Sequence, residues 1–334
     1  MTDLKWLSLT DATELARRAC LGAGASPQAA LALAQATVSA EAHGVASVGF
    51  RHLIDYLQSF REGRIDGKAM PILSSPAPAL IQCDARGGIG QLGFDQVFDD
   101  LAGRARSFGV ALFTQRDSYT TGELGYYARR LAEVGLAAFA ATNGPPLLAP
   151  PGSAKPVYCT NPLAFAAPRR DAPPLLIDQS SSATAFVNIR KAAELGQSIP
   201  PGWAIDAEGQ PTTDAREAVK GALLTFGGER GANIALMVEV LAAGLSGANW
   251  STDAPNSIAG ERSPGVGLVV IALNPTLLDP DFSERLDSHL QRLAALGVHI
   301  PGARKGVTAR EAEISGVSLP LDLLERIEAF SRPL

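Results

Sequence analysis

The stretch TNPLAFAAPRRDAPPLLIDQS, Thr160–Ser180, decides the fold, because it holds two short apolar runs that are each bounded by prolines. Such runs are typical of buried strands. Three segments follow it in order: IPPGWAIDAEGQPTTD at Ile199–Asp214, GALLTFGGERGANIALMVEVLAAGLSGA at Gly221–Ala248, and VGLVVIALNP at Val266–Pro275. We interpret them as a loop, a Gly-rich turn that leads into a well-buried helix, and a strand.

Upstream of this stretch, strand patterns alternate with helix patterns, whereas both ends of the chain are mainly helical. We expect strands within 78–90, 110–115 and 136–144, and helices at 11–21, 26–44, 50–60, 94–109, 123–135, 281–297 and 320–330. This order predicts an α/β class with a core at 76–279. The helical regions 1–75 and 280–334 are expected to pack together as a cap on that core.

Composition excludes several classes of protein. The chain has 334 residues, of which 46% are hydrophobic and 19% charged, and its formal net charge is -5. Without a run of Lys and Arg, it is expected to bind neither nucleic acid nor a membrane surface. No stretch approaches the roughly 18 apolar residues of a membrane span. The N-terminus lacks the apolar core of a signal peptide, so we expect a cytoplasmic protein.

The cysteines and histidines do not indicate a metal site. Cys20, Cys83 and Cys159 are far apart and form no C-x-x-C pair, so we expect buried apolar side chains instead of a disulfide or zinc framework. The chain has four histidines, and none is four residues from another as in a zinc hydrolase helix. We therefore predict no metal.

The Gly-rich segments do not match a Rossmann dinucleotide site. GGIGQLGF at Gly87–Phe94 lacks the G-x-G-x-x-G spacing that places a pyrophosphate at a helix N-terminus. GGERG at Gly227–Gly231 precedes a long helix, and its free N–H groups with Arg230 could bind an anion. The same turn could equally serve only to start the helix.

Taken with AEAHGVASVGFRHLIDYL at Ala40–Leu57 and ELGYYARRLAEVGL at Glu123–Leu136, the ordered segments resemble one family over nearly the whole chain. It is the malate/L-lactate dehydrogenase family that lies outside the ordinary lactate and malate dehydrogenases. The family includes sulfolactate, ureidoglycolate and diketogulonate oxidoreductases and reductases of Δ1-piperideine-2-carboxylate and Δ1-pyrroline-2-carboxylate. The resemblance implies a non-Rossmann nicotinamide-nucleotide-binding fold of the sulfolactate dehydrogenase type. It also implies a homodimer with a small-molecule substrate near the subunit boundary.

Several positions that carry the family's acid–base chemistry are replaced here. Family members usually have Ser-His-Gly where this chain has Ser47, Val48 and Gly49, and valine cannot carry a proton. The family arginine that binds the substrate carboxylate falls at His52, while Arg51 lies one residue earlier. A further family histidine falls at Thr120. The aspartate that supports the acid in the imine reductases falls at Asn188.

Other site positions are carried over from the resemblance, with Val48, Arg51, Tyr119 and Thr160 near the substrate. Tyr119 could donate a proton or could be a packing residue. The expected cofactor contacts are Thr120, Thr121, Gly122, Glu123, Leu124, Asp178, Gln179, Ser180, Glu229, Arg230, Arg304, Lys305 and Arg310. Glu229 and Arg230 replace the family's usual His-Lys pair. Because an arginine fork suits a 2′-phosphate, NADP is slightly favoured over NAD.

Ser47, His52 and Asn188 are the candidate catalytic residues. His52 follows Val48 by about one helical turn, which would put both on one face of a helix. As a group that titrates near neutrality, His52 could replace the missing acid or bind an anion. The alternative is a histidine on the surface of a helix with no part in the chemistry.

These observations predict an NAD(P)H-dependent reductase of a small carboxylate. Loss of a general acid slows carbonyl reduction by roughly 10²–10⁴-fold, whereas a substrate that already carries its proton, such as an iminium, loses much less. A cyclic imino acid or another activated C=N group is therefore preferred over a 2-oxo acid. The alternative is a redox-silent relative that binds a metabolite or catalyses a non-redox step.

Overall fold

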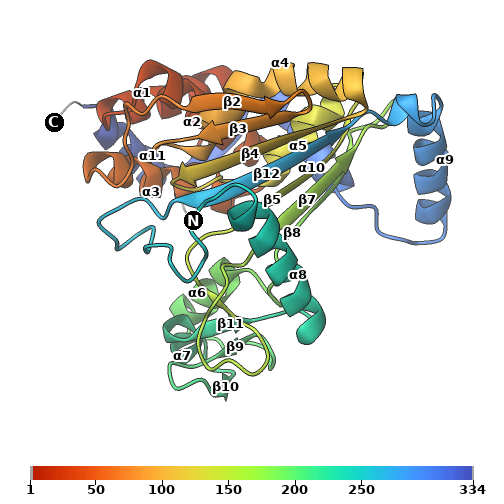
Figure 1. Cartoon of the computed structure of the whole chain (residues 1–334). Helices are drawn as coiled ribbons and strands as arrows, with labels where there is room; N and C mark the ends of the chain where they lie inside the picture. The colour runs from red at the N-terminus through yellow and green to blue at the C-terminus, as the bar shows by residue number, and fades with distance from the viewer. Residues whose placement is uncertain (1–2, 333–334) are drawn as a thin grey trace.

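The computed structural model describes residues 3–332 and confirms the predicted α/β class. A seven-stranded sheet forms the centre of the molecule, in the order β2-β3-β4-β12-β5-β7-β8 (Figure 1). β3 and β4 run parallel, and the other neighbouring strands run antiparallel. The strands are β2 (Ile72–Ala77), β3 (Leu80–Asp84), β4 (Val110–Ser118), β5 (Ala137–Thr142), β7 (Leu163–Ala167), β8 (Leu175–Gln179) and β12 (Val266–Leu273).

Helices cover the sheet and form a layer at one end of it. In chain order they are α1 (Leu9–Gly22), α2 (Pro27–Ala42), α3 (Phe50–Arg61), α4 (Gly90–Phe108), α5 (Gly125–Glu133), α6 (Phe186–Glu194), α7 (Ala215–Lys220), α8 (Glu229–Glu239), α9 (Phe282–Ala295), α10 (Ala303–Ser315) and α11 (Leu321–Glu328). The start of α2 is set by its sequence. The Ser26 hydroxyl accepts from the Ala29 N–H, and Pro27 takes the first helical position.

Strand β12 is buried on both faces because helices lie on both sides of it. Leu268 and Val270 pack with α4 and α5, and Val269 packs against Val238 of α8. Successive side chains of a strand point to opposite faces. The strand is therefore apolar at consecutive positions and shows no alternation.

The two ends of the chain form one layer. β1 (Leu4–Leu7) pairs antiparallel with β13 (Val317–Pro320), and α1 packs against α2, α3 and α11. α10 contacts α2. Leu15, Leu33 and Ile327 are buried together in the core of this layer. The contacts between the ends therefore run through α10, β13 and α11.

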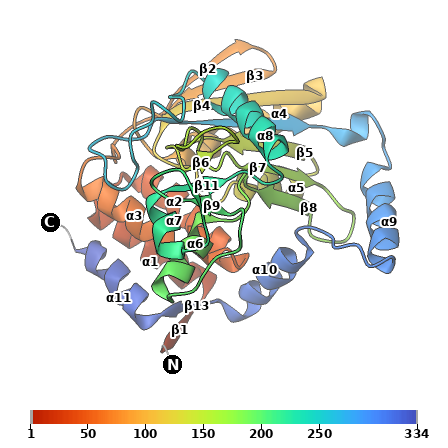
Figure 2. The same ribbon diagram turned by 90° about the horizontal axis from the view of Figure 1, so that it is seen from below.

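Helix α9 departs from the expected cap. It lies at the opposite end of the sheet from α1–α3 in both views (Figures 1 and 2). Its connection to the body includes ion pairs from Arg169 and Arg170, in the β7–β8 turn, to Asp287 and Glu284. The apolar repeat of α9 predicts a helix but not the surface that the helix covers.

A smaller lobe hangs below the central sheet (Figure 1). A second sheet, in the order β10-β9-β11-β6, packs there with α6 and α7. Its strands are β6 (Leu148–Ala149), β9 (Ala204–Ile205), β10 (Pro211–Thr212) and β11 (Ala222–Leu224). The prediction that 199–214 is only a loop is therefore wrong. Two-residue strands are too short to show alternation, and they are decided by pairing, of β9 with β11 and of β10 with β9.

The expectation that α8 is well buried is also wrong. Ala235 and Val238 face the interior, but Leu236, Met237 and Val240 are 48%, 42% and 48% exposed. An apolar composition on every side of a helix predicts full burial. Here only one side packs on the sheet and the smaller lobe. Among residues 3–332, the structure contains no helix with the length and apolar character needed to cross a membrane.

The sheet and α8 meet at a point that only glycine can occupy. A π-helical turn, Val240–Gly244, follows α8, and a Cβ on Gly267 of β12 would lie 2.0 Å from the Ala242 carbonyl oxygen. The Gly267 N–H also donates to Asn143 Oδ1 at 2.8 Å. A glycine within a strand commonly marks such a close backbone approach.

We predict that Gly267→Ala destabilises the protein by about 2 kcal/mol or more, since backbone atoms must shift to admit the methyl group. The matched control is Gly103→Ala in α4, where an added Cβ meets nothing within 4 Å. That change should stabilise by about 0.5–1 kcal/mol through helix propensity. Urea unfolding of the three proteins measures both effects, and equal shifts would contradict the close approach.

Candidate active site

The segment that carries Val48 is not continuous with the helix that follows it. Ala46–Val48 forms a separate 3₁₀ turn, and Gly49 breaks the chain before α3 begins. A Cβ on Gly49 would lie 2.2 Å from Glu41 Oε2, which accepts the Phe50 N–H at 3.1 Å. The expectation that Val48 and His52 share a helical face is therefore wrong. Ser47 is exposed in the same turn, and Arg51 is exposed at the start of α3.

His52 lies half-buried on α3 beside a carboxylate. Its Nδ1 is 3.1 Å from Asp55 Oδ2, and its ring meets the Tyr56 ring edge-on with centroids 4.9 Å apart. Within residues 3–332, the hydrogen bonds and ion pairs of its ring use Nδ1 and leave Nε2 available. The arrangement can hold a proton on Nε2 and orient it.

Tyr56 is a site residue that the sequence analysis missed. It is buried, and its oxygen accepts from Gln91 Nε2 at 3.1 Å and from Thr120 Oγ1. Burial raises the pKa of Tyr56, so its hydroxyl stays protonated. Tyr56 thus connects His52 with Thr120, the first residue of the expected cofactor segment. Its position one turn after His52 was the available signal.

Tyr119 is a packing residue, which corrects its assignment to the substrate site. It is 1% exposed within the core of the terminal layer. Its hydroxyl donates to the Ser257 carbonyl at 3.0 Å and accepts from Ser59 Oγ at 2.9 Å. The phenol proton of Tyr119 is therefore donated to a carbonyl within the protein. Tyr119 is not available as a proton donor to a substrate.

The segment Thr120–Leu124 is joined to β8 and α10 by buried charges. Asp178 Oδ2 accepts the Gly125 N–H at 3.0 Å, at the N-terminus of α5. Lys305 Nζ lies 3.6 Å from Glu123 Oε1 and 3.8 Å from Asp178 Oδ2. Arg129 pairs with Glu123 at 3.1 Å. Three segments from distant parts of the chain therefore meet at one ion cluster.

The pKa values of the two carboxylates in this cluster shift in opposite directions. Burial raises the pKa of Asp178, although Lys305 opposes the rise. Burial also acts on Glu123, but the charges of Arg129 and Lys305 outweigh it and lower the pKa of Glu123. The cluster therefore holds Glu123 as a carboxylate.

A second set of hydrogen bonds joins Thr160 to the Gly-rich turn. The Ser181 N–H donates to the Thr160 carbonyl at 2.8 Å, and the Phe226 N–H donates to the Ser181 carbonyl at 3.1 Å. Thr225 Oγ1 donates to the Gly228 carbonyl at 2.7 Å, which shapes the turn before α8. Ser180 therefore lies in the strand end that connects Thr160 with this turn.

The residue after Thr160 is held by a buried carboxylate. Asn161 has a left-handed backbone with φ 37°, and its Nδ2 donates to Glu239 Oε2 at 2.7 Å. Glu239 also accepts from the backbone N–H and the hydroxyl of Ser251. Glu239 is 4% exposed, and three donors satisfy it in place of a cation. This network fixes the backbone that presents Thr160.

A cavity of about 250 Å³ opens beside the ion cluster. It is lined by Arg129, Lys305 and Arg310, by Glu133 and Glu313, by Gly302 at the start of α10, and by apolar side chains such as Leu176. The three cationic side chains outnumber the two carboxylates, and together with the helix N-terminus they favour an anionic group. Two predicted cofactor residues, Lys305 and Arg310, therefore share one cavity.

Other predicted residues lie on the surface without such partners. Gln179, Asn188, Glu229, Arg230 and Arg304 are exposed. The Asn188 amide donates to Thr184 Oγ1 at 3.0 Å, within its own helix region. In the described range 3–332, Arg230, Arg304 and Arg310 take part in no ion pair. Their charges are therefore not neutralised by neighbouring carboxylates.

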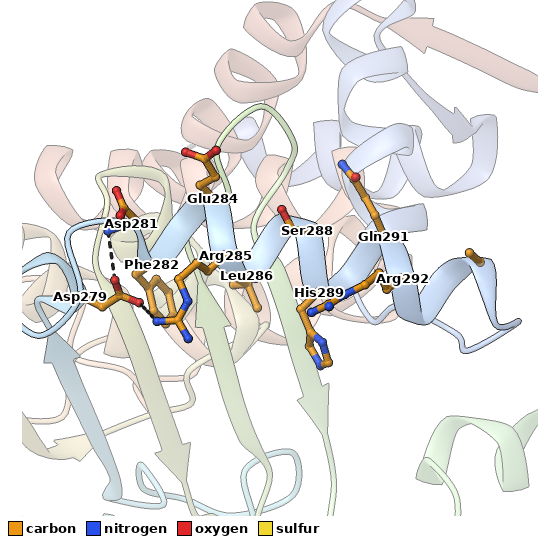
Figure 3. A pocket seen from close by; sticks show the side chains of 11 residues that line it. Asp279, Asp281, Phe282, Glu284, Arg285, Leu286, Ser288, His289, Gln291 and Arg292 are labelled. Carbon is orange, nitrogen blue, oxygen red and sulfur yellow. Dashed lines mark hydrogen bonds and ion pairs between the residues drawn. The ribbon is translucent and has the colours of Figure 1, made fainter.

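A hollow beside α9 does not coincide with the predicted site. It measures about 1170 Å³ and is lined only by residues of α9 and the turn before it (Figure 3). Phe282, Arg285, Leu286 and His289 project from one side of the helix there (Figure 3). A hollow bounded by a single helix cannot enclose a small molecule. We therefore assign the candidate active site to the segments around His52, Asp178 and Thr160.

Proteins with named activities are similar to this chain over most of its length. A (2R)-3-sulfolactate dehydrogenase (NADP(+)) of Chromohalobacter salexigens is 35% identical over 98% of this chain and 98% of its own. A Delta(1)-pyrroline-2-carboxylate/Delta(1)-piperideine-2-carboxylate reductase of Pseudomonas putida is 34% identical, covering 89% of this chain and 88% of its own.

Solved structures show the same fold. The delta1-piperideine-2-carboxylate reductase of Pseudomonas syringae superposes with a TM-score of 0.93, at 32% identity, covering 98% of this chain and 99% of its own. The sulfolactate dehydrogenase of Methanocaldococcus jannaschii has a TM-score of 0.88 at 24% identity, covering 98% and 96%, and shows the fold alone. The family model described as malate/L-lactate dehydrogenase matches residues 7–328. The chain therefore belongs to the malate/L-lactate dehydrogenase family.

Proposed function

We propose that the chain is an NAD(P)H-dependent reductase of a small carboxylate substrate, with a cyclic imino acid preferred over a 2-oxo acid. One observation carries the proposal. The segments that family resemblance assigns to cofactor and substrate, although distant in sequence, are joined by the Gly125–Asp178, Lys305–Asp178 and Ser181–Thr160 contacts. Relatives named as pyrroline- and piperideine-2-carboxylate reductases support the substrate class.

The residues of the site fit a phosphorylated dinucleotide. The cavity beside Lys305 and Arg310 accepts part of such a molecule, and the uncapped N-terminus of α10 faces it. Arg230 and Arg304 add exposed guanidinium groups without internal partners. Among residues 3–332, the buried Gln91 Oε1 has no hydrogen-bond partner, and the amide nitrogen of the same side chain lies beside Gly122, so Oε1 is an unused acceptor for a ligand amide. NADP is preferred because the sulfolactate dehydrogenase relative is named for it.

A bound dihydronicotinamide would supply the hydride, and the residues of this chain would supply binding and orientation. Ser47 and Thr160 would approach the substrate with their hydroxyl groups, and Arg51 would bind its carboxylate from the start of α3. Val48 replaces the family acid with an apolar wall. That wall suits a substrate whose nitrogen is already protonated, which makes an iminium a better substrate than a ketone.

A redox-silent protein that binds a metabolite is the second candidate. The motivating observation is the set of replaced positions, Val48, Thr120 and Asn188, of which Asn188 is exposed and bonded only within its own helix region. A protein of this kind would keep the fold and the small-molecule site but would transfer no hydride.

We further propose that the protein is a cytoplasmic homodimer. The exposed face of α8 continues from Leu236, Met237 and Val240 to Leu245 and Trp250, which are 53% and 45% exposed. Such a contiguous apolar face is uncommon on a monomer. Helix α9 projects from the body and has apolar ends, with Leu278 and Leu296 at 89% and 80% exposure. Both surfaces are suited to contact with a second copy.

The first prediction concerns the cofactor. Titration with NADPH, followed by nicotinamide fluorescence and melting temperature, should give a dissociation constant of about 10 μM or tighter. Arg310→Ala should weaken binding about tenfold through loss of a charge-assisted contact. Arg17→Ala, at an exposed guanidinium paired with Glu14, is the matched control and should bind as the wild type does. Binding of neither NADPH nor NADH would exclude the reductase and favour the redox-silent protein.

The second prediction concerns the substrate. With NADPH, cyclic Δ1-imino acids should be reduced with a kcat/KM at least about 100-fold above that for pyruvate, because an imine nitrogen is far more basic than a ketone oxygen and is protonated by a weaker acid. Steady-state rates at one pH compare the two classes. Oxidation of malate or lactate at rates matching imine reduction would contradict the preference.

The third prediction concerns the dimer. Leu236→Asp should convert the dimer to a monomer, since the change places a charge in the middle of the apolar contact. Sedimentation velocity measures the mass in solution. Leu31→Asp is the control, because Leu31 is 44% exposed on a different helix, α2. A wild-type protein that sediments as a monomer would contradict the proposed homodimer.

A further inference from the structure

We propose that His52 and Asp55 form a catalytic dyad that replaces the proton donor lost at Val48. The inference rests on the proposed reductase function and extends it by naming Asp55 as the positioning residue. Asp55 lies one helical turn after His52 on α3, so its carboxylate meets the imidazole on the same face of the helix. The separation between Nδ1 and Oδ2 is 3.1 Å, which is a hydrogen bond.

The dyad fixes which nitrogen of His52 can donate. A carboxylate that accepts from Nδ1–H holds the ring in one orientation and leaves Nε2 to carry the mobile proton. The Tyr56 ring restrains the imidazole through an edge-on contact of 4.9 Å, with the two rings at 74°. Asp55 therefore orients the His52 ring, and the Tyr56 ring packs against it. Both His52 and Asp55 remain partly exposed to solvent.

The same contacts connect the dyad to the cofactor segment. Tyr56, which packs against His52, accepts from Thr120 Oγ1, and Thr120 begins the segment 120–124. The polar atoms of Tyr56 are already bonded to Gln91 and Thr120, and burial raises the pKa of its phenol. Ser47 and Thr120 carry only weakly acidic hydroxyls. Of the groups joined here, the His52 imidazole is the one whose second nitrogen, Nε2, has no hydrogen-bond partner among residues 3–332.

The proposed step balances in atoms and electrons. For a neutral imine, hydride from a bound dihydronicotinamide would form the C–H bond at the imine carbon while the C=N π electron pair moves to nitrogen. That nitrogen would take one proton from His52 Nε2 to form the N–H bond of the amine product, so His52 supplies the proton that an iminium would already carry. His52 is left neutral, with Nδ1–H still bonded to Asp55, and regains its proton from solvent.

The proposal predicts a graded loss of turnover among variants. His52→Ala should lower kcat by about 100-fold or more while KM changes little, because the lost contact acts in the transition state. Asp55→Asn should lower kcat about tenfold, because the amide can hold the wrong tautomer of the ring. Asp55→Glu should recover most of the loss, since it restores the carboxylate. His299→Gln, at an exposed histidine outside the site, should leave kcat unchanged.

Chemical rescue tests the role of the imidazole directly. Imidazole added to His52→Ala should raise kcat at constant pH, and the wild type should show a solvent deuterium isotope effect on single-turnover reduction that His52→Ala loses. The melting temperature of each variant establishes that it is folded, and its NADPH affinity establishes that it binds the cofactor. A merely structural His52 would give no rescue.

Three outcomes distinguish the proposals. If the wild type reduces imines and the variants behave as above, the dyad is supported. If the wild type reduces imines but Asp55→Asn keeps its kcat within about twofold, or imidazole restores nothing, the dyad is overturned and the reductase stands. If the wild type binds NADPH but reduces no imine, the reductase function itself fails, and the dyad fails with it.

Discussion

The molecule depends on the insertion of β12 between β4 and β5. Without it the seven-stranded sheet would be two three-stranded pieces, each with an open edge. β12 comes from residues 266–273, more than a hundred residues after either neighbouring strand. The strand that completes the sheet therefore follows the smaller lobe and α8 in the sequence. Its fit requires a glycine at 267, where the backbone of the π-helical turn after α8 comes within reach. Sheet, helix and lobe are therefore joined at one tightly packed point.

The candidate site follows from that closure. The expected cofactor and substrate segments stand at the ends of β4 and β8, beside β7 and ahead of α8, and the sheet brings these ends near one another. Backbone hydrogen bonds through Ser181 and the ion cluster of Glu123, Asp178 and Lys305 then fix their spacing. Because the contacts are largely buried, the site is organised before any ligand binds, which lowers the entropic cost of binding.

In the proposed dyad, the proton reaches the substrate from a different element than in relatives that keep the family histidine. Val48 lies in a 3₁₀ turn and has no proton to donate. Four residues later, α3 carries the His52 imidazole, which Asp55 orients. Moving the donor from a turn to a helix changes its approach to the substrate. A shifted donor would favour a substrate of different shape from those of relatives that keep the histidine, so the altered residues and an altered substrate are consistent with one another.

The sequence by itself determined the α/β class, most strands of the central sheet and the start of α2, because periodicity and capping are local properties. It did not predict α6, α7 or α10, and it began α4 at Phe94 instead of Gly90. Ser26 and Pro27 begin α2 as their chemistry requires, and the apolar run at 266–273 is a buried strand. Motif order also placed the chain in its family and indicated which segments would meet. The strand and helix signals are each visible in a short stretch of consecutive residues, whereas the family resemblance rests on the order of segments along nearly the whole chain.

Only the tertiary structure decided what each side chain contacts. It placed Tyr119 in a core and Tyr56 beside His52, and it left one apolar face of α8 uncovered. It also separated α9 from the terminal helices and formed strands from the dipeptides 204–205 and 211–212. Apart from the contact of Tyr56 with His52, which lie one helical turn apart on α3, none of these outcomes is local, since each depends on which distant segment packs against the residue. A sequence pattern specifies that a side chain is apolar or polar, and the partner that covers it is chosen only when the chain is folded.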